Sequence, residues 1–241
     1  MPNRVHDQDT TLLPPIETHD LRTNLVAFLD APFPDPITGE SVPVGNYRWG
    51  VYAFYDYDLE PIYIGQTNER LRTRIRRHLT NQRTDAVAMS VLDPFEVFEI
   101  EVWPLPQFEM LAAAGKAAAK DTLNALELAV YNRALDQSVF HAVLNEKNPP
   151  VGLTEIDLES IPSLRRRIVS DRVYEIRSHP DFRIARRALI ISRLAQVISE
   201  RKVQTGLRRV LSTQAKRLEW LAERRFAGLG GEAAVPVEDD E

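Results

Sequence analysis

Two short motifs and a basic segment bring together residue types that can do chemistry on phosphate. Residues 50–52 read Gly-Val-Tyr, and after ten more residues, residues 63–65 read Tyr-Ile-Gly. Residues 70–83 then contain six arginines, no acidic residue, and His78. Phenol and imidazole groups can donate and accept protons, and one guanidinium group can bind two phosphate oxygens at once. The order of these residues therefore indicates a phosphate-handling site.

A β-hairpin is the element that would carry the two tyrosines. Residues 50–55 and 61–65 are rich in aromatic and β-branched side chains and predict two strands joined by a five-residue turn. Side chains alternate between the two faces of a strand. We therefore expect Tyr52 and Phe54 to share one face of the sheet.

A helix is expected directly after the hairpin, over residues 69–79. Its apolar residues recur every four positions, at Leu71, Ile75 and Leu79. Arg70, Arg74 and His78 form a second stripe, about 100° around the same helix. The pattern therefore places three cationic or proton-carrying groups along one edge of a packed helix.

Other segments predict one further strand and several helices. The expected strand is 95–103, and the expected helices are 17–30, 121–135, 155–177, 181–202 and 203–226. We divide the chain into an amino-terminal extension with one helix (1–45), a catalytic domain (46–150), a basic all-helical domain (151–228) and an acidic disordered tail (229–241).

Composition sets limits on the class of protein. Hydrophobic residues make up 44% and charged residues 27% of the 241 residues, which is typical of a globular chain. We find no secretion signal or membrane span, and there is no cysteine for a disulfide or a thiolate zinc site. These features predict a cytoplasmic protein with no membrane partner.

Positive charge is concentrated although the net charge is −5. Residues 163–226 contain seventeen Lys and Arg against six Asp and Glu. Such a segment can clamp a polyanion such as DNA. It can equally be a dimerisation or partner-binding bundle whose arginines are solvated, and the sequence leaves both interpretations open.

Glu127 is the acid that we single out as a metal ligand. It lies on the expected helix 121–135, beside apolar residues at helical spacing. An ionised carboxylate in such a place is costly unless it is paired or holds a metal ion. The alternative is a glutamate neutralised by a nearby arginine.

The Gly-Val-Tyr and Tyr-Ile-Gly motifs and the arginine-rich helix after them resemble the GIY-YIG nuclease family in their order and spacing. Val51 stands in place of the usual isoleucine. The resemblance covers about residues 45–150. It implies an α/β (α+β) fold in which a small three-stranded antiparallel sheet is flanked by helices. It also implies one divalent cation, Mg²⁺ or Mn²⁺, held on a single glutamate that matches Glu127, and no small-molecule cofactor.

The resemblance further assigns roles to individual residues. Tyr52 matches the general base or water-positioning tyrosine, and Tyr63 matches the tyrosine that orients the water and the phosphate. Arg74 and His78 match an arginine that stabilises the transition state and a histidine four residues later, although strict counting leaves Arg72 as an alternative. We expect Arg74 and the cation to favour the phenolate form of Tyr52.

A supporting asparagine and a set of phosphate contacts complete the expected site. Asn145 is the nearest match to the family asparagine, with Asn148 as the alternative. The arginines expected to contact nucleic acid are Arg70, Arg72, Arg76, Arg77 and Arg83.

Taken together, these features predict a metal-dependent endonuclease acting on DNA, in restriction or phage defence, with a homodimer as one way to cut both strands. The alternatives are a structure-specific repair or recombination nuclease, a catalytically silent DNA-binding protein on the same fold, and a cytosolic interaction module.

Overall fold

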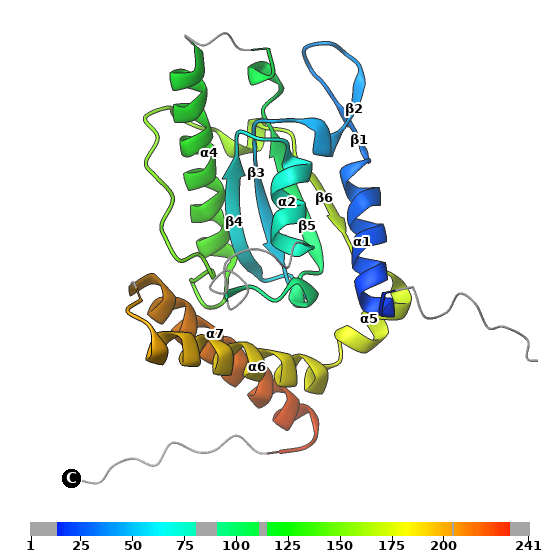
Figure 1. Cartoon of the computed structure of the whole chain (residues 1–241), viewed down its shortest axis with the longest axis vertical. Helices are drawn as coiled ribbons and strands as arrows, with labels where there is room; N and C mark the ends of the chain where they lie inside the picture. Colours follow the sequence, from blue (N-terminus) through cyan, green and yellow to red (C-terminus); the bar gives the residue numbers. More distant parts are fainter. Residues whose placement is uncertain (1–13, 81–90, 111–114, 204, 232–241) are drawn as a thin grey trace, which may run out of the picture.

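The computed structural model describes residues 14–80, 91–110, 115–203 and 205–231, and Figure 1 shows their arrangement. The strands are β1 (Pro32–Pro34), β2 (Ser41–Pro43), β3 (Gly50–Tyr55), β4 (Pro61–Thr67), β5 (Glu99–Pro104) and β6 (Leu164–Arg167). The α-helices are α1 (Ile16–Leu29), α2 (Leu71–Leu79), α4 (Lys116–Gln137), α5 (Asp171–Arg177), α6 (Pro180–Glu200) and α7 (Thr205–Gly228). The expected mixed α/β class is confirmed.

The central sheet is antiparallel, with the strand order β4-β3-β5-β6. Strands β3 and β4 form the predicted hairpin, in which Tyr52 pairs with Gly65 and Phe54 pairs with Tyr63. Because β4 lies at one edge, its outer backbone groups are open to pairing with other parts of the chain. This edge borders the candidate site.

The expected three-stranded sheet is wrong, because β6 adds a fourth strand from the segment that we predicted to be helical. Pro162 lacks a backbone N–H and disrupts a helix at this point. The strand that follows is basic and pairs with an acidic neighbour, where Arg165 Nε lies 2.6 Å from Glu99 Oε2. The two residues are diagonal neighbours in the register, and oppositely charged side chains on neighbouring strands stabilise this pairing. The carboxy-terminal region is therefore not all helical.

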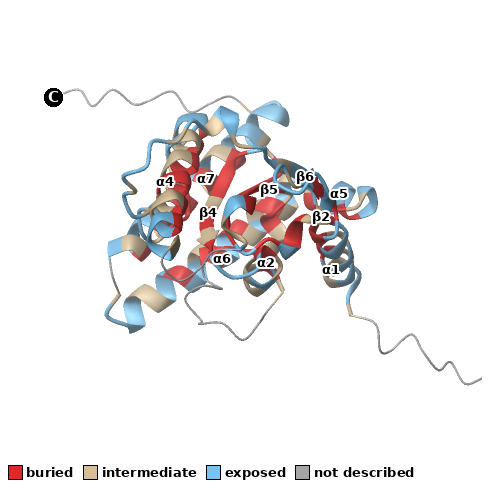
Figure 2. Ribbon diagram, turned by 90° about the horizontal axis from the view of Figure 1, so that it is seen from above, coloured by how far each residue is buried: buried red, intermediate tan, exposed pale blue. Residues whose placement is uncertain are grey.

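Alternation along β3 builds two apolar clusters, one on each face of the sheet. Tyr52 and Phe54 face the side covered by α1 and α2, while Val51 and Ala53 face α4. Figure 2 shows buried residues running through the sheet between these helices. The predicted assignment of the β3 side chains to faces is confirmed.

The two carboxy-terminal helices contribute to the first of these clusters. Leu194 of α6 and both Leu207 and Val210 of α7 belong to the same apolar cluster as Tyr52 and Phe54. Helices α6 and α7 pack side by side below the sheet (Figure 1). Among the described residues, no helix is both long and apolar enough to cross a membrane.

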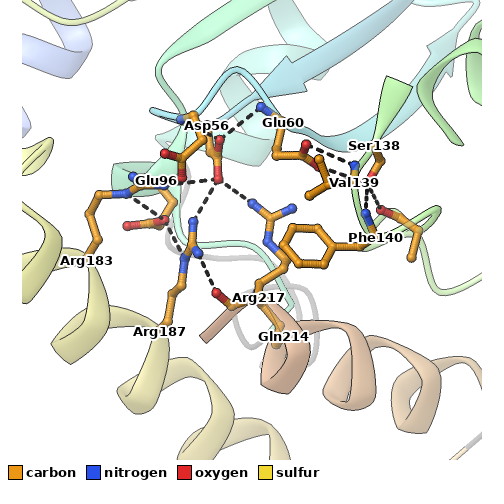
Figure 3. A network of polar contacts seen from close by, with 12 residues as sticks. Asp56, Glu60, Glu96, Ser138, Val139, Phe140, Arg183, Arg187, Gln214 and Arg217 are labelled. Atoms are coloured by element: carbon orange, nitrogen blue, oxygen red, sulfur yellow. Dashed lines mark hydrogen bonds and ion pairs between the residues drawn. The ribbon is translucent and has the colours of Figure 1, made fainter. Parts of the chain in front are cut away.

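A buried ionic cluster joins these two helices to the hairpin turn (Figure 3). Asp56, which directly follows β3, accepts hydrogen bonds at Oδ2 from Arg183, Arg187 and Arg217. All four residues are at least 97% buried. Three arginines of the basic segment therefore hold the chain together and do not face a polyanion.

Candidate active site

A cleft of about 560 Å³ runs along the outer edge of β4, between α2 and α4. Five of the predicted site residues line it: Tyr63, Arg74, His78, Glu127 and Asn145. The predicted groups thus come from a strand, two helices and a loop, and they meet at one surface.

Tyr52 lies beside this cleft and is completely buried. Its hydroxyl is 2.9 Å from Nε2 of His78 and accepts a hydrogen bond from Nε of Arg74 at 3.4 Å. Arg74 and His78 are one turn apart on α2, so both can reach the same phenol. Gly65 makes room for this ring, since a Cβ at that position would lie 2.4 Å from the Tyr52 hydroxyl oxygen.

Burial controls the protonation states of this pair. Desolvation, followed by the neighbouring Tyr63, raises the pKa of Tyr52 well above 10, although Arg74 opposes the shift. Desolvation and the nearby Arg74 and Arg77 lower the pKa of His78 to about 4. The protein environment by itself therefore favours the phenol form of Tyr52 and the neutral imidazole form of His78. The effect of a bound cation on Tyr52 stays a prediction.

Tyr63 forms an aromatic group with the neighbouring rings. Its centroid is 5.1 Å from that of His78 and 6.3 Å from that of Tyr52. Aromatic pairs at such distances pack favourably and restrict each other. Tyr63 therefore limits the orientation of both partners while it lines the cleft.

Glu127 projects from α4 into the other side of the cleft and is 8% exposed. Its Oε2 accepts a hydrogen bond of 2.6 Å from the amide of Gln66, which also donates to Asn124. Lys120 donates to the Oε1 of Gln66 at 2.8 Å. Sequence reasoning missed Gln66; its position directly after Tyr-Ile-Gly was the only available signal.

The environment of Glu127 fits a divalent cation. Desolvation raises the pKa of Glu127 in spite of Gln66, Lys120 and Arg74, so the local positive charge does not fully compensate the buried carboxylate. Mg²⁺ is often bound by one or two carboxylates together with water and substrate phosphates. The described residues contain no group of three or more His, Cys, Asp or Glu arranged to hold a metal ion. Two other carboxylates line the cleft, Glu69, which pairs with Arg77, and Glu146. The assignment of a cation to Glu127 stays a prediction.

Asn145 extends the edge of the sheet. Its side chain accepts a hydrogen bond from the backbone N–H of Ile64 at 3.0 Å and donates to the Ile64 carbonyl at 2.7 Å. The carboxamide thereby satisfies both edge groups of a residue that lies between Tyr63 and Gly65. Asn148 instead accepts hydrogen bonds from Tyr131 and Arg209. Of the two asparagines, Asn145 is the one attached to the motif strand.

The other arginines of α2 and its flanks differ in their surroundings. Arg72 points away from the cleft and pairs with Asp30 at 2.5 Å, so Arg74 is the arginine beside Tyr52. Arg77 pairs with Glu69. Arg70 and Arg76 are exposed, and Arg83 lies outside the described residues. Their contacts with nucleic acid stay predictions.

Strand β4 and helix α2 thus place Tyr63, Arg74 and His78 at one cleft, with Tyr52 of β3 beside it. Residues 48–108 match the family model described as the GIY-YIG catalytic domain, so the resemblance is confirmed over this segment. Neither a curated protein nor a solved structure matches the chain.

The matched segment includes Tyr52, Tyr63, Arg74 and His78 but ends before Glu127. The positions of Glu127 and Asn145 in the site therefore depend on the geometry of the cleft. The restriction-enzyme subtype, the homodimer and the cytoplasmic location stay predictions.

Proposed function

We propose that the protein is a divalent-metal-dependent endonuclease that hydrolyses phosphodiester bonds in DNA. One observation carries the proposal: Tyr63, Arg74, His78 and Glu127 line a single cleft, although they come from three separate elements. Phosphodiester hydrolysis needs a proton acceptor for water and positive charge near the phosphate. This cleft offers both.

The proton acceptor is the Tyr52–His78 pair. His78 lines the cleft and Tyr52 lies directly beside it, so the proposed reaction requires the buried Tyr52 hydroxyl to become open to the attacking water when substrate binds. As water attacks phosphorus, the Tyr52 oxygen takes a proton from the water and passes its own proton to Nε2 of His78, which lies 2.9 Å away. His78 then releases that proton to solvent. The low pKa of His78 keeps the ring neutral at neutral pH, and in the tautomer that carries its proton on Nδ1, Nε2 can accept this proton. In such a pair, Tyr52 accepts one proton as it loses another, so the reaction does not require a stable phenolate in a buried site.

Positive charge comes from Arg74 on one wall of the cleft and from a cation on the other wall. Arg74 can donate to Tyr52 and to a phosphate oxygen, because a guanidinium has five N–H donors. Glu127 would hold the divalent cation, which when bound offsets the negative charge that develops on the phosphate. Gln66 fixes the carboxylate that serves as the ligand.

Cleavage of supercoiled plasmid, with Mg²⁺ or Mn²⁺ and without metal, tests the proposal. We expect nicked and linear products with metal only. Glu127→Gln should abolish them, because the amide keeps the shape but loses the charge that binds the cation. Asp136→Asn is the matched control, since Asp136 is an exposed acid on the same helix, and it should cleave like the wild type. Binding without cleavage by the wild type would indicate a silent DNA-binding protein.

For the cellular role, we propose restriction of foreign DNA or defence against phage. Cells expressing the wild type should then reduce phage plating, and cells expressing Glu127→Gln should not. Normal plating on wild-type cells, together with cleavage of branched or flapped DNA in preference to plain duplex, would favour a repair or recombination nuclease instead.

A further inference from the structure

The first turn of α7 lies against the loop that carries Asn145. Gly206 approaches this loop so closely that a Cβ would lie 2.0 Å from the carbonyl oxygen of Glu146. Arg209, one turn further along, donates to the carbonyl oxygen of Asn145 at 3.0 Å and to the side-chain oxygen of Asn148 at 2.8 Å. Helix α7, which lies outside the matched residues 48–108, therefore contacts this loop and restrains it.

The same loop is joined to the motif strand on its other side. Asn145 pairs with both backbone groups of Ile64, and Leu144 donates its N–H to the carbonyl of Ile62 at 2.8 Å. Ile64 lies between Tyr63, which lines the cleft, and Gly65, which faces the Tyr52 hydroxyl. A displacement of the loop would thus be transmitted to the backbone beneath both tyrosines.

We propose that Arg209 is a positioning residue for the active site, acting through Asn145 on the strand that carries Tyr63 and Gly65. This inference rests on the proposed nuclease function. Arg209 does not line the cleft, so it acts on the loop and not on the substrate. A guanidinium suits this task because its fixed fork of donors binds two oxygen atoms at a defined separation.

The experiment compares Arg209→Gln with Arg208→Gln. Both residues are exposed arginines in the same turn of α7, so the two variants lose the same charge. Of the two, only Arg209 makes a side-chain hydrogen bond or ion pair with other described residues. We expect Arg209→Gln to lower kcat by about 10- to 100-fold, the scale of effect that a misplacement of about 1 Å produces. KM for DNA and the salt dependence of binding should change little, and Arg208→Gln should behave like the wild type.

A second readout does not depend on cleavage. Hydrogen exchange of the Ile64 amide, whose N–H is held by Asn145, should speed up in Arg209→Gln and stay unchanged in Arg208→Gln. If the wild type does not cleave DNA, the proposed function fails while this exchange test of the positioning role still stands.

Three results would overturn the inference. The first is wild-type kcat together with wild-type Ile64 exchange in Arg209→Gln. The second is a raised KM with a weaker salt dependence and an unchanged kcat, because that combination identifies Arg209 as a phosphate contact. The third is an equal loss of kcat in the two variants, since the effect would then come from charge alone.

Discussion

At the scale of single residues, burial limits how Tyr52 can act in the proposed proton path. A tyrosine whose pKa is raised above 10 cannot act as a free base at neutral pH. It can still accept a proton if it loses its own proton in the same step, and His78 is placed to receive it. The depressed pKa of His78 makes it a weak acceptor, so proton transfer in the proposed reaction must accompany attack and not precede it.

Replacing Tyr52 with phenylalanine tests this path directly. The variant keeps the ring that packs over Gly65 but removes the hydroxyl between His78 and Arg74. We expect the cleavage rate to fall by about 10²- to 10⁴-fold, the usual contribution of general acid–base catalysis, with DNA binding retained. Single-turnover cleavage and a binding assay measure the two effects.

The matched control for this variant is Tyr55→Phe. It removes a buried hydroxyl from the opposite face of the same strand, where Tyr55 donates to Glu101. Full activity of Tyr52→Phe, or an equal loss in Tyr55→Phe, would remove Tyr52 from the proton path.

The pH dependence of cleavage should show one limb only, on the acid side. Glu127 must be ionised to hold the cation, and burial raises its pKa above its ordinary value. His78 must be neutral, which it is above its lowered pKa of about 4. The rate should therefore rise with pH through the Glu127 pKa. It should then stay level through neutral pH, because Tyr52 remains protonated until well above pH 10.

Measuring this profile at two Mg²⁺ concentrations identifies the titrating group. Protons and metal compete for Glu127, so more Mg²⁺ should move the acid limb to lower pH. An acid limb whose position does not depend on the Mg²⁺ concentration, or a fall in rate between pH 7 and 9, would contradict the assignment of this limb to Glu127.

At the scale of elements, local patterns predicted the hairpin and α2, and with them four of the site residues. The alternation in residues 50–55 and the four-residue spacing of Leu71, Ile75 and Leu79 depend on neighbours in sequence, so a single chain is enough to recognise them. Tyr52 and Arg74 could therefore be placed before the fold was known.

The parts that the sequence did not predict depend on contacts between distant segments. Strand β6 contains three consecutive arginines and was predicted to be helical, because its acidic partner strand lies more than sixty residues away. Gln66 shows the same limit, since its role depends on Glu127 of α4. The buried state of Arg183 also depends on Asp56, which is distant in sequence.

The Asp56 cluster makes a testable contribution at this scale. Asp56→Asn would leave Arg183, Arg187 and Arg217 with one fewer negative charge in a site from which water is excluded. Breaking a buried ion pair in this way typically costs about 3–5 kcal/mol, so we expect a loss of this size in the free energy of unfolding. Urea denaturation followed by circular dichroism measures it.

Asp181→Asn is the control for this variant. Asp181 forms an exposed pair with Arg225 on the same two helices, where solvent screens the charges, and its replacement should change stability little. If Asp56→Asn were as stable as Asp181→Asn, the cluster would not be what joins α6 and α7 to the hairpin turn.

At the scale of the whole molecule, the carboxy-terminal third of the chain packs against residues 48–108, the segment that matches the family model. It supplies the edge strand β6, the arginines around Asp56, and apolar residues in the cluster that contains Tyr52. On sequence grounds, its many arginines indicated either DNA binding or a partner-binding helical bundle. Some of these arginines form internal ion pairs instead. Stability and activity should therefore be lost together when this region is removed.

A chain ending at Pro150 tests this dependence. It would expose the outer edge of β5 and uncover the apolar surface that Leu194, Leu207 and Val210 bury in the full chain. A fully buried aliphatic side chain contributes roughly 1.5–3 kcal/mol, so losing three of them removes a large part of the roughly 5–15 kcal/mol by which a typical domain is stable. We expect the fragment to lack a cooperative thermal transition and to be digested rapidly by protease. A fragment that melts cooperatively near the wild-type temperature and still cleaves DNA would show that the catalytic segment folds alone, and that the contacts made by α6 and α7 are dispensable.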